Sequence, residues 1–357
     1  MAIAAYMARD GYYIASAQGD DAGAGTGLTE WDNAQAALIV TELKAMDWFI
    51  GASVIHTKPK TVNVNPMTST HYPKRLVTGR TLGKIVSTHF LQTSVLSYYV
   101  MGASTAVAAD ATRAITKDTN EIPLWVAFHL EKEGSNTSRR KDIMGVVPNN
   151  LNVACSEQEP IARQTYTGEF SFTGTGGDLA QPTALVQATH PPFTWSHYRS
   201  ASGTSAFTYN AGAAINVDII GFNINFGWSG STFGTYDANG YPNNGYYDPP
   251  FTTRVTLECK YKDHTGTDIQ TISDLAPASY ANGGDLTLII NFYEDATNYM
   301  EYTFTDMFVD PDSFEEVFQS EGDWFDGFRF DLVFKDETST LALSSRDNLG
   351  DTYYTNP

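Results

Sequence analysis

Carboxylates are the residues of this chain whose grouping most suggests chemistry, because ten of them lie between positions 306 and 336, opposed only by Arg329 and Lys335. Aromatic residues interrupt the run, and acids beside aromatic rings are typical of carbohydrate sites. A glycosidase, however, needs two carboxylates held across a sugar, whereas these acids lie in one local run. We interpret the run as a solvated acidic surface, with a cation or subunit contact as the alternative. The acids assigned to this surface are Asp306, Asp310, Asp312, Glu315 and Glu316.

Other residue types that support catalysis or metal binding are scattered. Seven histidines occur without an HExxH or HxH motif, and there is no G-x-S-x-G elbow. Cys155 and Cys259 lie in separate strand-like segments and are predicted to be buried thiols, a disulfide being the alternative. The loop 237–248 alternates Asp and Asn with Gly but lacks the closing Glu of a calcium loop. We therefore expect no enzyme and no cofactor, with bound calcium or another cation left open.

The net charge of −19 is unevenly distributed along the chain. Residues 1–142 hold 14 Lys and Arg against 13 Asp and Glu, whereas residues 143–357 hold 8 against 28. Affinity for phosphates comes from clustered Lys and Arg, so this composition disfavours nucleic-acid binding. Asp outnumbers Glu by 26 to 15, a balance compatible with a halophilic source.

The one basic stretch lies within residues 43–83, where three prolines, Pro59, Pro66 and Pro73, are regularly spaced. Proline removes a backbone donor, so this composition suits an extended arm better than a core strand. A solvated loop is the alternative. The cations that we assign to a contact made by this arm are Lys58, Lys60, Lys74, Arg75 and Arg80.

Alternating apolar residues predict strands over most of the remaining chain, including two similar hairpins formed by segments 146–153 with 165–172 and 219–226 with 251–259. Apolar residues at three- and four-residue steps predict a helix over about 84–101, ended by Gly102. The sequence lacks an apolar run of transmembrane length and a signal-peptide pattern at its start, so no membrane contact is expected.

The predicted fold is therefore mainly β, a barrel or sandwich with one flanking helix and long extended loops. We expect residues 1–310 to form the β domain and residues 311–357 to form an acidic, aromatic extension packed on or beside it.

The order of these segments resembles that of the tail tube, or major tail, proteins of long-tailed bacterial and archaeal viruses over nearly the full length. The segments that carry the resemblance are 11–14, 80–102, 122–126, 145–153 with 166–172, 217–226, 254–259 and the closing strands that end near Asp310. The long basic arm and the residues after Asp310 depart from the pattern.

The resemblance implies a structural virion protein whose copies, six to a ring, stack into a hollow tube through which viral DNA leaves. It also implies tape-measure, tail terminator and baseplate proteins as partners, assembly in the host cytoplasm, and a place in the virion tail, here of a haloarchaeal host. A lumen lined by carboxylates would let DNA pass without adhering.

A carbohydrate-binding β-sandwich of a virion or cell surface is the competing function. It is supported by Trp195, Trp228, Trp324 and the Tyr-rich loop near Tyr246. Exposed aromatic rings that form a sugar platform would favour it, and buried tryptophans would not. A β-fold glycoside hydrolase ranks third.

Charge reversal in the arm tests the stacking hypothesis. The basic arm and the acidic body are complementary, and a contact between two different surfaces can propagate without limit. Replacing Lys58, Lys60, Lys74, Arg75 and Arg80 by Glu should block tube growth while leaving the circular dichroism spectrum unchanged. Normal tubes from this variant, seen by negative-stain microscopy, would contradict the hypothesis.

Overall fold

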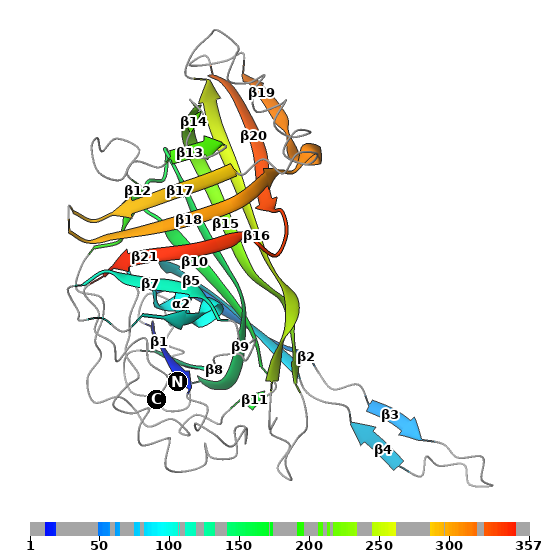
Figure 1. Cartoon of the computed structure of the whole chain (residues 1–357). Coiled ribbons are helices and arrows are strands. Elements are labelled where there is room, and N and C mark those ends of the chain that lie inside the picture. Colours follow the sequence, from blue (N-terminus) through cyan, green and yellow to red (C-terminus); the bar gives the residue numbers. More distant parts are fainter. Residues whose placement is uncertain are drawn as a thin grey trace.

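The computed structural model shows a mainly β protein built from two layers of antiparallel strands (Figure 1). The structure describes residues 11–18, 49–57, 61–64, 75–78, 82–105, 107, 111–118, 125–132, 141–170, 172–173, 191–195, 206–209, 213–214, 217–233, 245–261, 286–295, 297–319 and 325–347.

The first layer, called here the long sheet, contains eight strands in which every neighbouring pair is antiparallel. It includes both hairpins predicted from the sequence. In spatial order its strands are β19 (Glu315–Gln319), β20 (Phe325–Phe334), β16 (Gly245–Tyr261), β15 (Val217–Phe233), β9 (Lys141–Ser156), β10 (Arg163–Phe170), β5 (Leu82–Phe90) and β2 (Phe49–Thr57). The sheet does not close into a barrel, so the sandwich form of the predicted fold is the one observed.

The second layer crosses the long sheet, as the yellow, orange and red strands of Figure 1 show. Its strands are β12 (Thr194–Trp195), β13 (Ala206–Tyr209), β14 (Ala213–Ala214), β17 (Leu286–Tyr293), β18 (Tyr299–Val309), β21 (Thr340–Arg346), β7 (Arg113–Lys117) and β6 (Gly102–Ser104). The end of β18 pairs with the end of β20, which joins the two layers along one side. Crossed sheets of this kind enclose a core between their inner faces.

Three further strands extend the first half of β9. These are β8 (Trp125–Lys132), β1 (Gly11–Gln18) and β11 (Phe172–Thr173). A separate two-stranded sheet is formed by β3 (Thr61–Val64) and β4 (Arg75–Thr78), and Figure 1 shows it lying away from the two layers.

Aromatic rings from both layers meet in the core. Phe222 of β15 packs edge-on against Phe292 of β17 at 5.5 Å between ring centroids, and Phe226 lies 6.2 Å from Tyr302 of β18. These rings are buried because strand residues alternate between the two faces of a sheet, as in β10, where every second residue is buried. Each buried aromatic ring contributes about 1.5–3 kcal/mol by leaving water, so this cluster is a main source of sandwich stability.

The predicted helix over 84–101 is only partly correct. Residues 82–90 form strand β5, and the helix, α2, spans Val95–Met101. The strand was missed because its inward positions include Ser87 and His89, so polar residues interrupted the apolar alternation while the outward Val86 suggested helical spacing. The predicted stop is confirmed, since Gly102 caps the helix in the left-handed conformation, with φ of 94°.

The predicted division at residue 310 does not appear in the fold. Strands β20 and β21 lie after it, and they pair with β16, β18 and β7 inside the two layers. A 3₁₀ turn, Pro311–Ser313, leads directly into strand β19. The described part of the predicted extension is therefore an integral part of the sandwich.

Asp347, just after strand β21, forms hydrogen bonds with the start of helix α2. Its buried carboxylate accepts hydrogen bonds from the backbone N–H and the hydroxyl of Ser94, the residue that precedes α2, each at 3.0 Å. The Ser94 hydroxyl also lies 2.7 Å from that of Ser345. The first turn of α2 is thus held by residues 251 and 253 positions later in the sequence.

Asp347→Ala should lower the free energy of unfolding by about 2 kcal/mol, because a buried N–H and hydroxyl lose their acceptor. Urea titration followed by fluorescence measures the change. Glu337→Ala, in an exposed turn, is the matched control and should shift stability by no more than about 0.5 kcal/mol. Equal stability of the two variants would show that Asp347 does not hold the helix.

Candidate assembly surfaces

The outward side of the long sheet, called here the polar face, carries side chains that bond across the strands. The hydroxyls of Thr88 and Thr165 lie 3.1 Å apart. The amide of Asn150 donates to Asn225 at 2.5 Å, and that of Asn152 donates to Asn223. The asparagines recur two residues apart in β9 and in β15, the Asn-rich alternation visible in the sequence. These contacts leave a flat surface of amide and hydroxyl groups.

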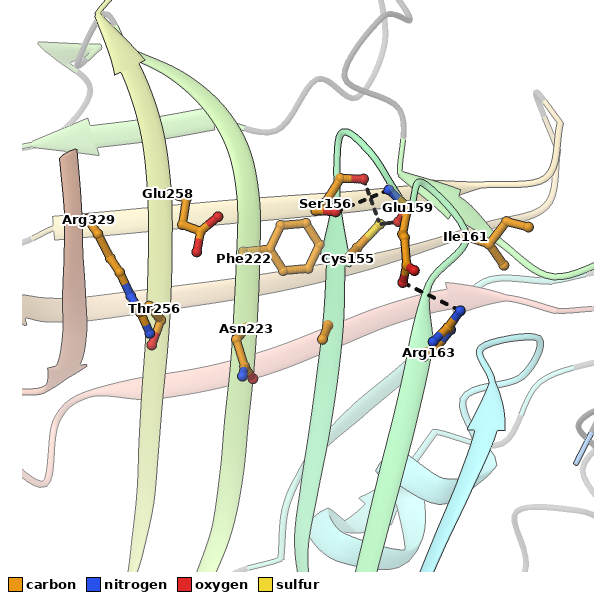
Figure 2. Close-up of a pocket in the computed structure, with 11 residues that line it drawn as sticks. Cys155, Ser156, Glu159, Ile161, Arg163, Phe222, Asn223, Thr256, Glu258 and Arg329 are labelled. Carbon is orange, nitrogen blue, oxygen red and sulfur yellow. Dashed lines mark hydrogen bonds and ion pairs between the residues drawn. The ribbon is translucent and has the colours of Figure 1, made fainter. Parts of the chain in front are cut away.

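A hollow of about 310 Å³ lies at one end of this face (Figure 2). Ala154 lines it with a short side chain. Gly221 precedes the lining residue Phe222 in β15, and a Cβ at position 221 would lie 3.0 Å from a carboxylate oxygen of Glu258, which also lines the hollow. Charges of both signs surround it, including the ion pair of Arg163 with Glu159 at 3.4 Å. Burial raises the pKa of Cys155 to about 12, so the thiol in this lining stays protonated and donates to the Glu159 carbonyl at 3.3 Å. Both cysteines are free and buried, as expected.

The predicted acidic surface is partly neutralised within the chain. Arg254 lies 3.2 Å from a carboxylate oxygen of Asp310 and 2.5 Å from one of Asp331, and Thr256 donates to Asp331 at 2.6 Å. Asp310 also accepts from the backbone N–H of Asp312, capping the 3₁₀ turn. The neutralising cation was missed because it lies 56 positions before Asp310 and becomes its neighbour only in the folded sheet.

The other predicted acids differ in their positions. Asp312 and Glu315 are exposed. Asp306 is half-buried and adopts a positive φ of 57° near the end of β18, where its carbonyl accepts from Ser339 at 2.7 Å. Glu316 follows Glu315 in strand β19. The two exposed acids of the group, Asp312 and Glu315, therefore lie before and at the start of β19.

The predicted arm is shorter than the residues 43–83 assigned to it. Strand β2 (49–57) belongs to the long sheet, where it pairs with β5. The hairpin β3–β4 is the part that lies away from the layers, and Arg75 begins β4 opposite Val64. The predicted contact residues Lys58, Lys60, Lys74 and Arg80 lie outside the described residues.

Strand β2 is an edge strand of the long sheet, and several of its side chains are exposed to solvent. Among the described residues it pairs on one side only. Ile50 and Ile55 are 43% and 53% exposed, and Ala52 and Ser53 are exposed as well. Its nine residues contain neither a Lys, Arg, Asp or Glu nor a proline, the usual protections of an edge strand. The sequence gives little sign of this surface, because cations and prolines dominate the composition of the residues around β2.

The tryptophans proposed for a sugar platform are covered where the structure describes them. Trp195 and Trp228 are 5% and 4% exposed. The ring of Trp228 stacks on Tyr247 at 4.3 Å, lies 5.0 Å from the Lys117 ammonium, and donates its N–H to the Val100 carbonyl. Tyr246 is half exposed, and Trp324 lies outside the described residues. The described rings thus give the carbohydrate-binding alternative no support.

The residues that the structure describes contain no group of three or more His, Cys, Asp or Glu side chains able to hold a metal ion. Their helices are all too short or too polar to cross a membrane. Most of the calcium-like loop at 237–248 lies outside the described residues. No protein-family model matches the sequence, and no curated protein is similar to it.

His89 gives the sandwich a defined response to acid. It is 1% exposed on the inner side of β5, and burial lowers its pKa from 6.5 to about 3. Below pH 6.5 the unfolded chain therefore binds a proton that the folded chain does not. Stability from this residue is complete above pH 6.5 and falls by up to about 1.4 kcal/mol per pH unit between pH 6.5 and 3.

Urea titrations between pH 7 and 4 should show a smaller loss of stability for His89→Gln than for the unaltered protein. The carboxylates act in both proteins, so the difference between the two slopes isolates the histidine. Equal slopes would mean that His89 does not carry this pH dependence.

Proposed function

We propose that this protein is a structural subunit that assembles with copies of itself into rings, and that the rings stack into the tail tube of a long-tailed virus. The observation that carries the proposal is the long sheet, whose end strand β2 pairs on one side only among the described residues. A strand end with free backbone donors and acceptors is a template for another chain. The exposed side chains of Ile50 and Ile55 add apolar surface, and its removal from water on binding is favourable.

The hairpin β3–β4 supports stacking in the second direction. It lies away from the layers of its own chain, and the sequence around it contains the cations of the basic arm. An adjacent ring would offer the exposed carboxylates Asp312 and Glu315. Asp310 contributes less than its position in the acidic run suggests, because Arg254 already pairs with it.

The polar face is the surface that we assign to the bore of the tube. Its asparagine and threonine side chains are uncharged and bond to one another. The cations Arg163 and Arg254 are each paired with a carboxylate of the same chain. DNA would meet amides, hydroxyls, the paired Arg163 and Arg254 and the separate exposed cations Lys84 and Arg329 there, rather than the acid-lined lumen expected from the sequence. Neither surface would offer the clustered cations that bind phosphates tightly.

The remaining expectations follow as part of the same proposal. Six copies would form each ring; tape-measure, tail terminator and baseplate proteins would contact the tube, and the assembled protein would reside in the virion tail. No catalytic step is proposed.

Negative-stain microscopy of the purified protein, from low to molar salt, should show rings or hollow tubes of constant width. Ile55→Asp should abolish them and leave a monomer with an unchanged circular dichroism spectrum, because a charged side chain on an edge strand opposes pairing with another chain. Ile161→Asp alters an equally exposed isoleucine beside the hollow and should assemble normally. Monomer at every salt concentration would overturn the proposal.

A further inference from the structure

We propose that the turn between strands β17 and β18 binds a calcium ion through Glu294, Asp295 and Asn298. Two carboxylates and one buried amide meet there, and they supply the oxygen ligands that hard cations take. Because one ligand is an amide, the site differs from the clusters of His, Cys, Asp and Glu that the described residues lack. The ends of β17 and β18 that flank the turn lie at the left of Figure 1, away from the hairpin β3–β4. The site is therefore separate from the surfaces assigned to assembly.

Asp295 is held in position by the backbone of the turn. One of its carboxylate oxygens accepts the N–H of Thr297 at 2.6 Å and that of Asn298 at 2.8 Å. The backbone N–H of Glu294 donates to the carbonyl of Asn298 at 3.1 Å and closes the turn. The second carboxylate oxygen of Asp295 lies beside the side chain of Asn298.

Asn298 gives the evidence for a ligand. The residue is 7% exposed, and its amide nitrogen donates to Glu294 at 3.2 Å and to Asp295 at 3.3 Å. Its amide oxygen, in contrast, has no hydrogen-bond partner. A buried polar atom without a partner is unfavourable and rare in folded proteins. The amide is thus directed at two carboxylates while half of its bonding capacity is unused.

Rotation of this amide about its last torsion exchanges its oxygen and its nitrogen. In the rotated side chain the oxygen of Asn298 faces the carboxylates of Glu294 and Asp295. Three oxygens facing one another repel, and a cation placed among them reverses the sign of the interaction. The amide therefore donates to the carboxylates when no cation is bound and joins them as a ligand when one is.

The spacing of these groups favours calcium over magnesium. Calcium holds oxygen atoms at about 2.4 Å, so neighbouring ligands at right angles lie about 3.4 Å apart. Magnesium holds them at about 2.1 Å, which brings such neighbours to about 3.0 Å. The amide position lies 3.2 Å from Glu294 and 3.3 Å from Asp295, on average nearer to the calcium value. Asp295 is exposed, so water molecules have access to complete the coordination.

The charge around the turn is negative. No Lys or Arg occurs in the sequence between Lys262 and Arg329. Burial, and after it the carboxylate of Glu301, raises the pKa of Tyr293, the residue that precedes Glu294. A third carboxylate thus lies within electrostatic reach of the turn and adds to the attraction for a cation.

Terbium luminescence measures this site directly. Terbium resembles calcium in size and ligand preference, and it emits when a nearby tyrosine absorbs light. Tyr293 and Tyr299 flank the turn, with their ring centroids 6.3 Å apart. Terbium chloride should give a saturable emission that calcium chloride displaces at about 0.15 M ionic strength, where loose attraction to surface acids is screened. Glu294→Gln and Asp295→Asn should each weaken the binding of both ions about tenfold or more, because the number of charged ligands sets the affinity.

Asp336→Asn is the matched control. Asp336 lies in the exposed turn between β20 and β21, where it accepts the backbone N–H of Thr338 at 2.8 Å, much as Asp295 accepts N–H groups in its own turn. The control variant should bind both ions as the unaltered protein does. An equal loss of binding in the control, or unchanged binding in Asp295→Asn, would show only general attraction to an acidic chain and would overturn the proposal.

Asn298→Asp separates a ligand from a structural hydrogen-bond donor. Without calcium its melting temperature should fall below that of the unaltered protein, because three carboxylates then face one another. Calcium chloride should raise the melting temperature of this variant by more than that of the unaltered protein, since a third charged ligand strengthens binding. A loss of stability that calcium does not reverse would mean that Asn298 acts only as a donor, and the site would be rejected.

Discussion

The need of each strand for hydrogen-bond partners on both sides is the constraint from which the rest of this structure follows. A sheet satisfies its backbone groups internally except at its ends, and only closure removes those ends. Among the described residues the long sheet stays open, because its end strands β2 and β19 each pair with a neighbouring strand on one side only. The second layer covers the inner face of this sheet but supplies no strand for either end.

The two faces of the long sheet differ in composition: the inner face is buried and largely apolar, and the outer face is polar. On the inner face, Phe222 and Phe226 pack against rings of the second layer, and His89 is held neutral by burial. On the outer face, asparagine amides bond to one another and Arg254 joins two carboxylates. The buried core stabilises the fold of the chain, whereas the polar face exposes amides and hydroxyls and little apolar surface. The apolar contact area is concentrated instead on the end strand, at Ile50 and Ile55.

Alternation along the chain was enough to predict the β class and the two central hairpins, because their inward positions are almost all apolar. It failed in β5, where Ser87 and His89 are buried, and in β2, where nearby lysines and prolines suggested an arm. The boundary at 310 was misplaced because acidity implied an exposed extension, although the inward residues Phe328, Phe330 and Leu332 of β20 are buried. The pairing of Arg254 with Asp310 and the open ends of the sheet depend on strand order, which no local pattern contains.

Amide hydrogen–deuterium exchange in the assembled and monomeric protein tests most directly whether the end strand β2 makes the contact. Backbone N–H groups that gain a partner become protected, whichever side chains surround them. On assembly, protection should rise in residues 49–57 and remain unchanged in the central strands β9 and β15. Assembled protein in which β2 exchanges as fast as in the monomer would contradict the account.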